Sequence, residues 1–304
     1  MKGRLRAFLL GALAIVAVPA AAHPSYGIVV DAQDRVTFSD LVTVWRIEPN
    51  RRLRILRPGG DWHIHELAIG AGGTVYGEQA TYDPADQSYR AGLWKIAPDG
   101  GFAWLLRPTT RPPKGLSLWR DREGATYSSH WTNTTDRTLL LFRRSREGRV
   151  TMLQGEPRAA AQARQVLLSN IGGTTVAPDG AVWLTNGPQL WRATPGGPAR
   201  RFAWRDPGAG RAPSLRGIAL ERAGRIVAAD MERRRVLRIL PDGRTSVIHR
   251  SAPGWLPTGI ALSSTGILVL EAGIHAGPEE GAVRVLRLRD GRAPETLARV
   301  PAKR

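Results

Sequence analysis

The chain has 304 residues, of which 42% are hydrophobic and ten are tryptophan, so it can bury a large core without a stabilising ion. It contains no cysteine, which excludes disulfide bonds and a cysteine nucleophile. Its net charge of +18 comes from 40 arginines and 4 lysines against 26 acids, spread along the whole chain, which favours a solvated surface over a nucleic-acid site and leaves adhesion to anionic envelope polymers open.

Residues 1–22 predict a secretory signal peptide. Lys2, Arg4 and Arg6 precede an apolar stretch over residues 7–18, and small residues allow cleavage after Ala22. A membrane anchor is the alternative, but a spanning helix needs about 20 apolar residues. No cysteine follows the cleavage site, which excludes a lipoprotein, and loss of the three basic residues leaves a net charge of +15. We expect a periplasmic or secreted protein without a transmembrane segment.

Residues 23–304 contain six copies of one pattern. Each copy has a glycine, a short apolar run, a turn, and a second β-rich run that ends on a polar residue. An aromatic, a basic and an aliphatic residue follow. The copies begin at Gly27, Glu66, Gly115, Gly173, Gly217 and Gly259, which are 39 to 58 residues apart. A period of about 40 residues with four β segments is typical of propeller blades. The sequence therefore predicts one all-β domain, a six-bladed β-propeller of four-stranded antiparallel blades that start near residues 24, 63, 112, 170, 214 and 256.

Within each blade the pattern predicts where the strands lie. The innermost strands are short and apolar, as in residues 28–30, 67–69 and 260–262. We expect the outermost strands to be the least regular. Ring closure would join blade 1 to blade 6 by side-chain packing without a shared sheet. One short helix is considered in residues 155–170, where Pro157 lies near its start.

The first copy, GIVVDAQDRVTFSD, followed by Trp45, Arg46 and Ile47, resembles the NHL repeat, as do the Pro-Asp-Gly turns of later copies. Residues 24 to about 300 resemble secreted bacterial NHL-repeat proteins. These belong to a six-bladed group that also holds gluconolactonase-like, strictosidine synthase-like and peptide-amidating-lyase propellers. The resemblance implies the fold, whereas this group contains both enzymes and binding platforms.

Gluconolactonase-like propellers hold a divalent cation with Asn, Asp and Glu, several of them directly before the first glycine of a repeat. The corresponding residues of this chain are Tyr26, His65, Lys114, Gly172, Arg216 and Thr258. None of them is an acidic or amide ligand, and a hard cation needs several oxygens. The resemblance therefore does not carry lactonase chemistry to this chain.

Five of the six histidines are predicted on one face, where chain segments enter the innermost strands and leave the second strands. His63 and His65, with His130 of the next blade, could form a three-nitrogen site for zinc or copper. Glu78 and Tyr26 would then be the candidate acid and base. The alternative is that the first two are polar loop residues and that His130 only ends a strand.

Second strands close on carboxylates in three blades, at Asp40, Asp230 and Glu271. Such residues can act in catalysis, but they commonly accept backbone N–H bonds and stabilise a loop. We favour the structural role for these three residues.

Candidate ligand-binding residues lie on the same face. Arg216 and Lys114 would suit a carboxylate or phosphate, or would simply be solvated at the rim. Asn170, Trp131 and Asp230 complete this set. Long loops would line the channel mouth, and they are residues 79–92, 131–137 and 273–281.

Two functions stay open. Neither a Gly-x-Ser-x-Gly motif nor a glycine-rich phosphate loop is present. We favour a monomeric binding propeller that presents this face to a small anionic molecule, a glycan or a protein, and we do not expect nucleic acid as a partner. The alternative is a metal-dependent hydrolase or lyase, for which a divalent metal (zinc, copper or calcium) is the candidate cofactor.

Overall fold

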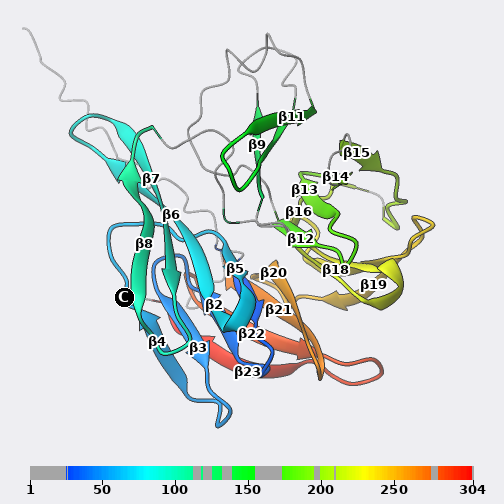
Figure 1. The fold of residues 1–304 in the computed structure, drawn as a ribbon. Coiled ribbons are helices and arrows are strands. Elements are labelled where there is room, and N and C mark those ends of the chain that lie inside the picture. Colours follow the sequence, from blue (N-terminus) through cyan, green and yellow to red (C-terminus); the bar gives the residue numbers. More distant parts are fainter. Residues whose placement is uncertain are drawn as a thin grey trace, which may run out of the picture.

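The structure is a computed structural model that describes residues 25, 27–111, 118, 125–131, 139–154, 173–194, 199–208, 210–274 and 280–302. The described strands form six separate antiparallel sheets, one for each repeat. Figure 1 shows these sheets following one another in chain order around a common centre. The prediction of an all-β, six-bladed propeller is confirmed.

Blades 1 to 3 are formed by the first eleven strands. From the inside outward, the strands are β1 (Ile28–Val30), β2 (Val36–Ser39), β3 (Val44–Ile47) and β4 (Leu53–Arg57) in blade 1, β5 (Leu67–Ile69), β6 (Val75–Asp83), β7 (Ser88–Ile96) and β8 (Phe102–Thr109) in blade 2, and β9 (Thr126–Trp131), β10 (Leu139–Arg144) and β11 (Val150–Gln154) in blade 3.

Blades 4 to 6 each have four described strands. These are β12 (Gly173–Val176), β13 (Val182–Asn186), β14 (Gln189–Ala193) and β15 (Ala199–Phe202), then β16 (Leu215–Leu220), β17 (Ile226–Asp230), β18 (Arg235–Ile239) and β19 (Thr245–Arg250), and finally β20 (Trp255–Ser263), β21 (Gly266–Gly273), β22 (Val283–Leu288) and β23 (Glu295–Val300). Two single 3₁₀ turns, η1 (Ala71–Gly73) and η2 (Arg222–Gly224), lie between the first two strands of blades 2 and 5.

The glycines that begin the repeats allow the innermost strands to approach each other closely. A Cβ atom at Gly173 would lie 2.4 Å from the carbonyl oxygen of Arg216, and one at Gly217 would lie 2.6 Å from the Cα atom of Gly259. Interiors this tightly packed have no room for the extra atom. Glycine is therefore required where the inner edge of one blade meets the next, and Glu66 in blade 2 is the exception to the pattern.

We expect Gly217→Ala to lower the free energy of unfolding by about 1–3 kcal/mol, because overpacking moves the backbone of the next blade. Gly101→Ala is the control, since this glycine is exposed and its Cβ would meet only the carboxylate of Asp99, at 3.2 Å, and the Cβ of Ala97, at 3.9 Å. Urea unfolding followed by tryptophan fluorescence measures both variants. Equal stability of the two would contradict this role of the glycine.

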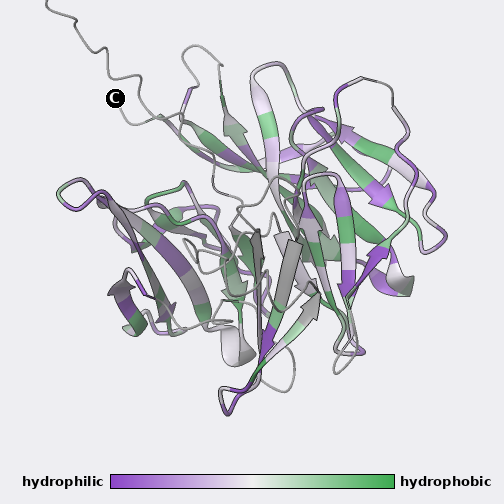
Figure 2. Cartoon of the chain, turned by 90° about the horizontal axis from the view of Figure 1, so that it is seen from above, coloured by the Kyte–Doolittle hydropathy of each residue, from purple (hydrophilic) through white to green (hydrophobic). Residues whose placement is uncertain are grey.

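Apolar residues fill the spaces between neighbouring blades. Figure 2 shows hydrophobic bands along the strands and hydrophilic residues in the peripheral hairpin turns. The cluster that closes the ring packs Ile28 and Phe38 of blade 1 against Leu268 and Val285 of blade 6. The backbone N–H of Ser264 also donates to Asp34 across this seam, at 2.9 Å. Closure by side-chain packing without a shared sheet is therefore confirmed.

Blade 2 departs from the prediction. Its second strand was expected to end at Glu78 and to continue into a loop over residues 79–92, but β6 runs to Asp83 and pairs with β7 along its whole length. The rings of Tyr82 and Tyr89 contact each other across this hairpin, with centroids 5.0 Å apart. Cross-strand aromatic pairs of this kind stabilise an antiparallel pair. Residues 79–92 are therefore a hairpin of two paired strands and not a loop.

The outermost strands are irregular, as predicted, because the register shifts between the third and fourth strands of blades 1, 2, 3, 5 and 6. The predicted signal peptide and the helix considered in residues 155–170 lie outside the described residues. Across the part of the chain that the structure describes, no helix is long and apolar enough to cross a membrane.

Candidate functional site

Asp40 organises the turn that follows β2. One of its carboxylate oxygens accepts the backbone N–H groups of Val42 and Thr43, at 3.1 and 2.7 Å. The other accepts the indole N–H of Trp45, at 2.9 Å. The structural role favoured for this carboxylate is confirmed.

Asp230 ends β17 and is fully buried. One carboxylate oxygen lies 2.8 Å from Nε of Arg235, and the other accepts the backbone N–H of Ser214, at 3.0 Å. Arg235 also reaches Asp206, at 2.7 Å, in the segment between blades 4 and 5. Burial alone would lower the pKa of Arg235, but its hydrogen bonds to the two aspartates raise it overall. Both oxygens of Asp230 are thus engaged within the protein.

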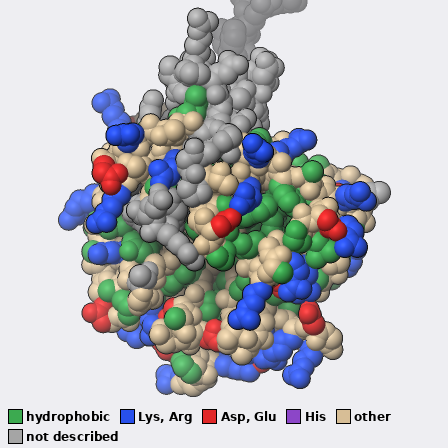
Figure 3. All heavy atoms as spheres, turned by 45° about the vertical axis from the view of Figure 1, so that its right-hand side comes forward, with side chains coloured by type: hydrophobic (Ala, Val, Ile, Leu, Met, Phe, Trp, Pro, Cys, Tyr) green, Lys and Arg blue, Asp and Glu red, His purple; other side chains and the backbone are tan. Residues whose placement is uncertain are grey.

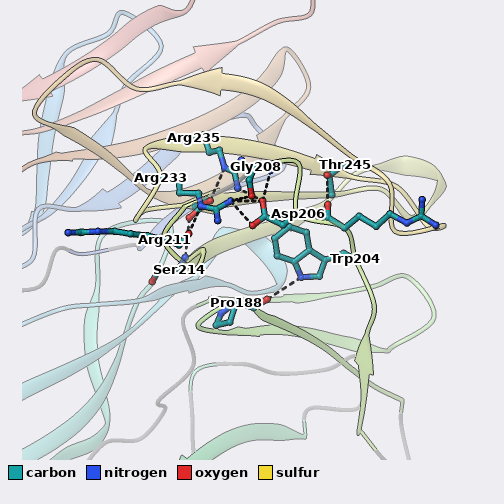
Figure 4. Close-up of polar contacts among 11 residues, drawn as sticks. Pro188, Trp204, Asp206, Gly208, Arg211, Ser214, Arg233, Arg235 and Thr245 are labelled. Atoms are coloured by element: carbon teal, nitrogen blue, oxygen red, sulfur yellow. Dashed lines mark hydrogen bonds and ion pairs between the residues drawn. The ribbon is translucent and has the colours of Figure 1, made fainter.

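The segment that carries Asp206 is held against blade 5 by several such bonds. Figure 4 shows Arg233 and Arg235 both directed at this aspartate. Arg233 also donates to the carbonyl of Gly208, at 3.0 Å. Burial would raise the pKa of Asp206, but the bonds and charges of these arginines lower it. The arginines of this region therefore serve to join two blades.

Glu271 was expected to close the second strand of blade 6, but β21 continues in paired form to Gly273. The residue is fully buried. It accepts hydrogen bonds from the hydroxyl of Ser251 and from Nε of Arg284, the latter at 2.7 Å. Nε2 of His249 lies 3.1 Å from the same carboxylate. Burial would raise the pKa of Glu271, but the bonds from His249 and Ser251 and the charge of Arg284 bring it below its usual range. These partners are side chains and not the backbone N–H groups expected for a carboxylate that stabilises a loop, and they engage both oxygens of Glu271 within the protein.

These contacts share one arrangement, which we call the inter-blade polar contacts. In each, a polar side chain just after or near the end of one blade's outermost strand bonds to a residue within the second strand, or at the start of the third, in the next blade. The pairs are Arg57 with Gln79, Asp206 with Arg235, and His249 with Glu271. The arrangement explains why so many polar residues gather on the predicted functional face.

Arg57 is buried among aromatic rings. Its guanidinium carbon lies 4.5 Å from the ring centroid of Trp62 and 4.8 Å from that of Trp94, with Phe102 and Trp104 at 5.1 and 5.5 Å. Burial lowers its pKa to about 10, so the side chain stays charged at neutral pH. Such rings attract a buried cation through their negative faces.

His63 and His65 lie together at the start of blade 2. Their rings contact edge to face, with centroids 5.8 Å apart, and His63 is exposed while His65 is half-buried. The backbone of His63 pairs with Ala80, two residues beyond the buried Glu78. His130 lies in β9, but its side chain is outside the description. Among the described residues, no three His, Cys, Asp or Glu side chains form a group that could hold a metal.

Arg216 lies in β16, directly before Gly217, and is half-buried. Its carbonyl oxygen accepts the hydroxyl of Thr185 in blade 4, at 3.1 Å. Within the described part of the chain its guanidinium has no hydrogen bond or ion pair. The remaining predicted site residues lie outside the description, with only the backbone of Trp131 included, and they are Tyr26, Lys114, Asn170 and Trp131.

A cavity of about 800 Å³ lies between the innermost strands, on the axis of the ring. It extends from the level of Glu66, Gly173 and Gly217 to the ends of these strands, where Ile69 and Leu262 line it. The predicted site residues His63, His65, Glu78, Arg216 and Asp230 do not line it. Figure 3 shows hydrophobic side chains in the middle of one face, with basic residues around them. The size fits a small-molecule site.

No protein-family model matches the chain, and the curated proteins contain no match. Solved structures do match. A streptogramin B lyase is 17% identical, with a TM-score of 0.50 over 92% of this chain and 84% of that one. A gluconolactonase from Xanthomonas campestris is 13% identical, with a TM-score of 0.55 over 88% and 87%. A chain of the nidogen/laminin complex is 14% identical, with a TM-score of 0.53 over 87% and 92%. All three are six-bladed β-propellers. The likeness shows the fold alone.

The carboxylates at or near the ends of second strands were predicted from the sequence, but their partners were not. His249 was the one histidine left out of the predicted face, and it contacts Glu271. Asp206 and Arg57 were not singled out either. These partners could have been sought from the sequence, because each of the three lies at or just after the end of an outermost strand that leads into the next repeat.

Proposed function

We propose that this protein is an exported propeller that binds a small ligand in its central channel. The observation that carries the proposal is the axial cavity of about 800 Å³, lined by apolar side chains such as Val30, Val176 and Leu220. Asp40, Asp230 and Glu271 are all hydrogen-bonded within the protein, which supports a binding role over carboxylate catalysis. Export rests on the predicted signal peptide in residues 1–22.

The test is a titration with N-phenyl-1-naphthylamine, a neutral apolar dye that fluoresces when it leaves water. We expect saturable binding by the wild-type protein. Leu262→Trp, which places a larger ring in the channel, should weaken binding at least tenfold, whereas Ile55→Trp on the exposed surface should not change it. Equal binding by these two variants would show that the dye does not occupy the channel.

The contact between His63 and His65 favours a second candidate, a metal-dependent hydrolase or lyase. Imidazole nitrogens two residues apart are suitable ligands for zinc or copper, with His130 as the third and Glu78 as a base. In that case purified protein should bind one metal ion per chain, and His65→Ala and His130→Ala should each abolish binding. Elemental analysis that finds neither zinc, copper nor calcium would remove this candidate.

A further inference from the structure

Arg57 is a buried cation at the interface of blades 1 and 2, and its partners are neutral. The residue is 7% exposed, and Nη2 of its guanidinium donates to the side-chain oxygen of Gln79. Burial lowers its pKa to about 10, and no carboxylate of the described residues forms an ion pair with it. Arg235, which is 2% exposed, instead bonds to two aspartates. Because a buried charge is costly unless an opposite charge faces it, Arg57 lacks a counter-charge.

Nη1, the other terminal nitrogen of Arg57, is buried and has no hydrogen-bond partner among the described residues. Four aromatic rings surround the guanidinium, with centroids 4.5 to 5.5 Å from its carbon, and they belong to Trp62, Trp94, Phe102 and Trp104. Ring faces attract the positive charge, but they are weak acceptors of an N–H bond. Since most buried polar atoms are hydrogen-bonded, an acceptor is expected beside Nη1.

Trp94 provides an independent observation. It is fully buried, and its indole nitrogen Nε1 also has no acceptor in the described part of the chain. Its ring is closely packed across Gly77, where a Cβ atom would come within 1.9 Å of Cζ2. The indole N–H of Trp62, by contrast, donates to the carbonyl oxygen of Val42, at 3.1 Å. The guanidinium carbon of Arg57 lies 4.8 Å from the ring centroid of Trp94, so the two donors without acceptors belong to side chains in contact.

We propose that the interface between blades 1 and 2 binds a halide ion, chloride or bromide, which accepts hydrogen bonds from Nη1 of Arg57 and Nε1 of Trp94. The ion supplies the negative charge that Arg57 lacks. A single-atom anion suits two donors that are both closed off from solvent, whereas a phosphate or carboxylate brings further oxygens that need their own donors. Chloride and bromide also lose their hydration more readily than fluoride. Neither Arg57 nor Trp94 lines the axial cavity, so this site is separate from the proposed ligand site.

The experiment measures the NMR linewidth of chloride in solutions of the purified protein at pH 7 and constant ionic strength. A chloride ion held in an asymmetric site relaxes quickly and broadens the signal. We expect saturable broadening by the wild-type protein, which bromide reverses and fluoride does not. Arg57→Met, which keeps an apolar side chain and removes the charge, should weaken chloride binding by roughly tenfold or more. Arg211→Ala, which removes a side chain that is 85% exposed, should behave like the wild type.

Urea unfolding provides a second measurement, because a ligand that binds only the folded protein stabilises it by mass action. The wild-type protein should be more stable in chloride or bromide than in fluoride, relative to Arg57→Met, which reports the general effect of each salt. If Arg57→Met fails to fold, Trp94→Phe, which removes the indole N–H, should still weaken chloride binding several-fold. Broadening that does not saturate, or that survives both substitutions, would overturn the halide site and assign the acceptor to an ordered water molecule.

Discussion

Arg235→Ala is expected to lower the free energy of unfolding by about 3–5 kcal/mol, because it leaves the fully buried carboxylate of Asp230 without its cation. Asp206 is exposed and keeps its ion pair with Arg233. Arg235 is 2% exposed, and its side chain lies 2.8 Å from Asp230 and 2.7 Å from Asp206. The first aspartate belongs to blade 5 and the second to the segment that leaves blade 4. Loss of the arginine therefore weakens the contact between blades as well as the end of one strand.

Urea unfolding of the two proteins measures this effect, with Arg211→Ala as the control. Arg211 also pairs with a carboxylate, that of Glu232, but its side chain is 85% exposed. Exposed ion pairs contribute little, so this variant should unfold like the wild-type protein. Asp230→Ala combined with Arg235→Ala should cost less than the two changes added together, because each removes the partner of the other. Similar stabilities of the Arg235 and Arg211 variants would contradict the buried-pair argument.

The parts of the fold that could be predicted are those governed by spacing along one chain segment. The apolar residues 28–30 and 67–69 coincide with β1 and β5. The close approach at Gly173 and Gly217 shows why five of the six repeats begin with glycine. The alternation of apolar and polar residues and the residue preferences of tight turns each involve only a few consecutive residues. Both can therefore be recognised in the sequence. The same rules failed at residues 79–92, where the hairpin continues past a polar residue that looked like an end.

The candidate site was harder to predict, because it depends on contacts between blades. His249 and Glu271 are 22 residues apart, and Asp206 and Arg235 are 29 apart. Such pairs form because each sheet is twisted and stacks on the next sheet at a particular angle. Neither the twist nor the stacking angle produces a periodic pattern of residues in the sequence. The axial cavity is a similar case. The strands that line this cavity were predicted from the sequence as buried inner strands. The position and size of the cavity depend instead on how far apart these strands lie across the ring.

Glu271→Gln is expected to lower the free energy of unfolding by about 3 kcal/mol at pH 7, because the neutral amide replaces a buried carboxylate that faces Arg284, His249 and Ser251. The pH dependence distinguishes loss of charge from loss of shape. The pKa of Glu271 lies below its ordinary value of 4.5 in the folded protein, so the unfolded chain takes up the proton more readily. The contribution of the ionised carboxylate is therefore complete above about pH 5 and is lost as the pH falls through the folded-state pKa.

Unfolding measured between pH 3 and pH 7 should accordingly show a constant difference between wild type and Glu271→Gln at the upper end and a smaller one at the lower end. Glu280→Gln, at an exposed position of the same blade, should follow the wild-type curve throughout. A difference that keeps its size at pH 3 would mean that the amide disturbs packing and that the charge of Glu271 is not what holds blade 5 to blade 6. A difference that vanishes on acidification would assign the contact to the ionised carboxylate and its three donors.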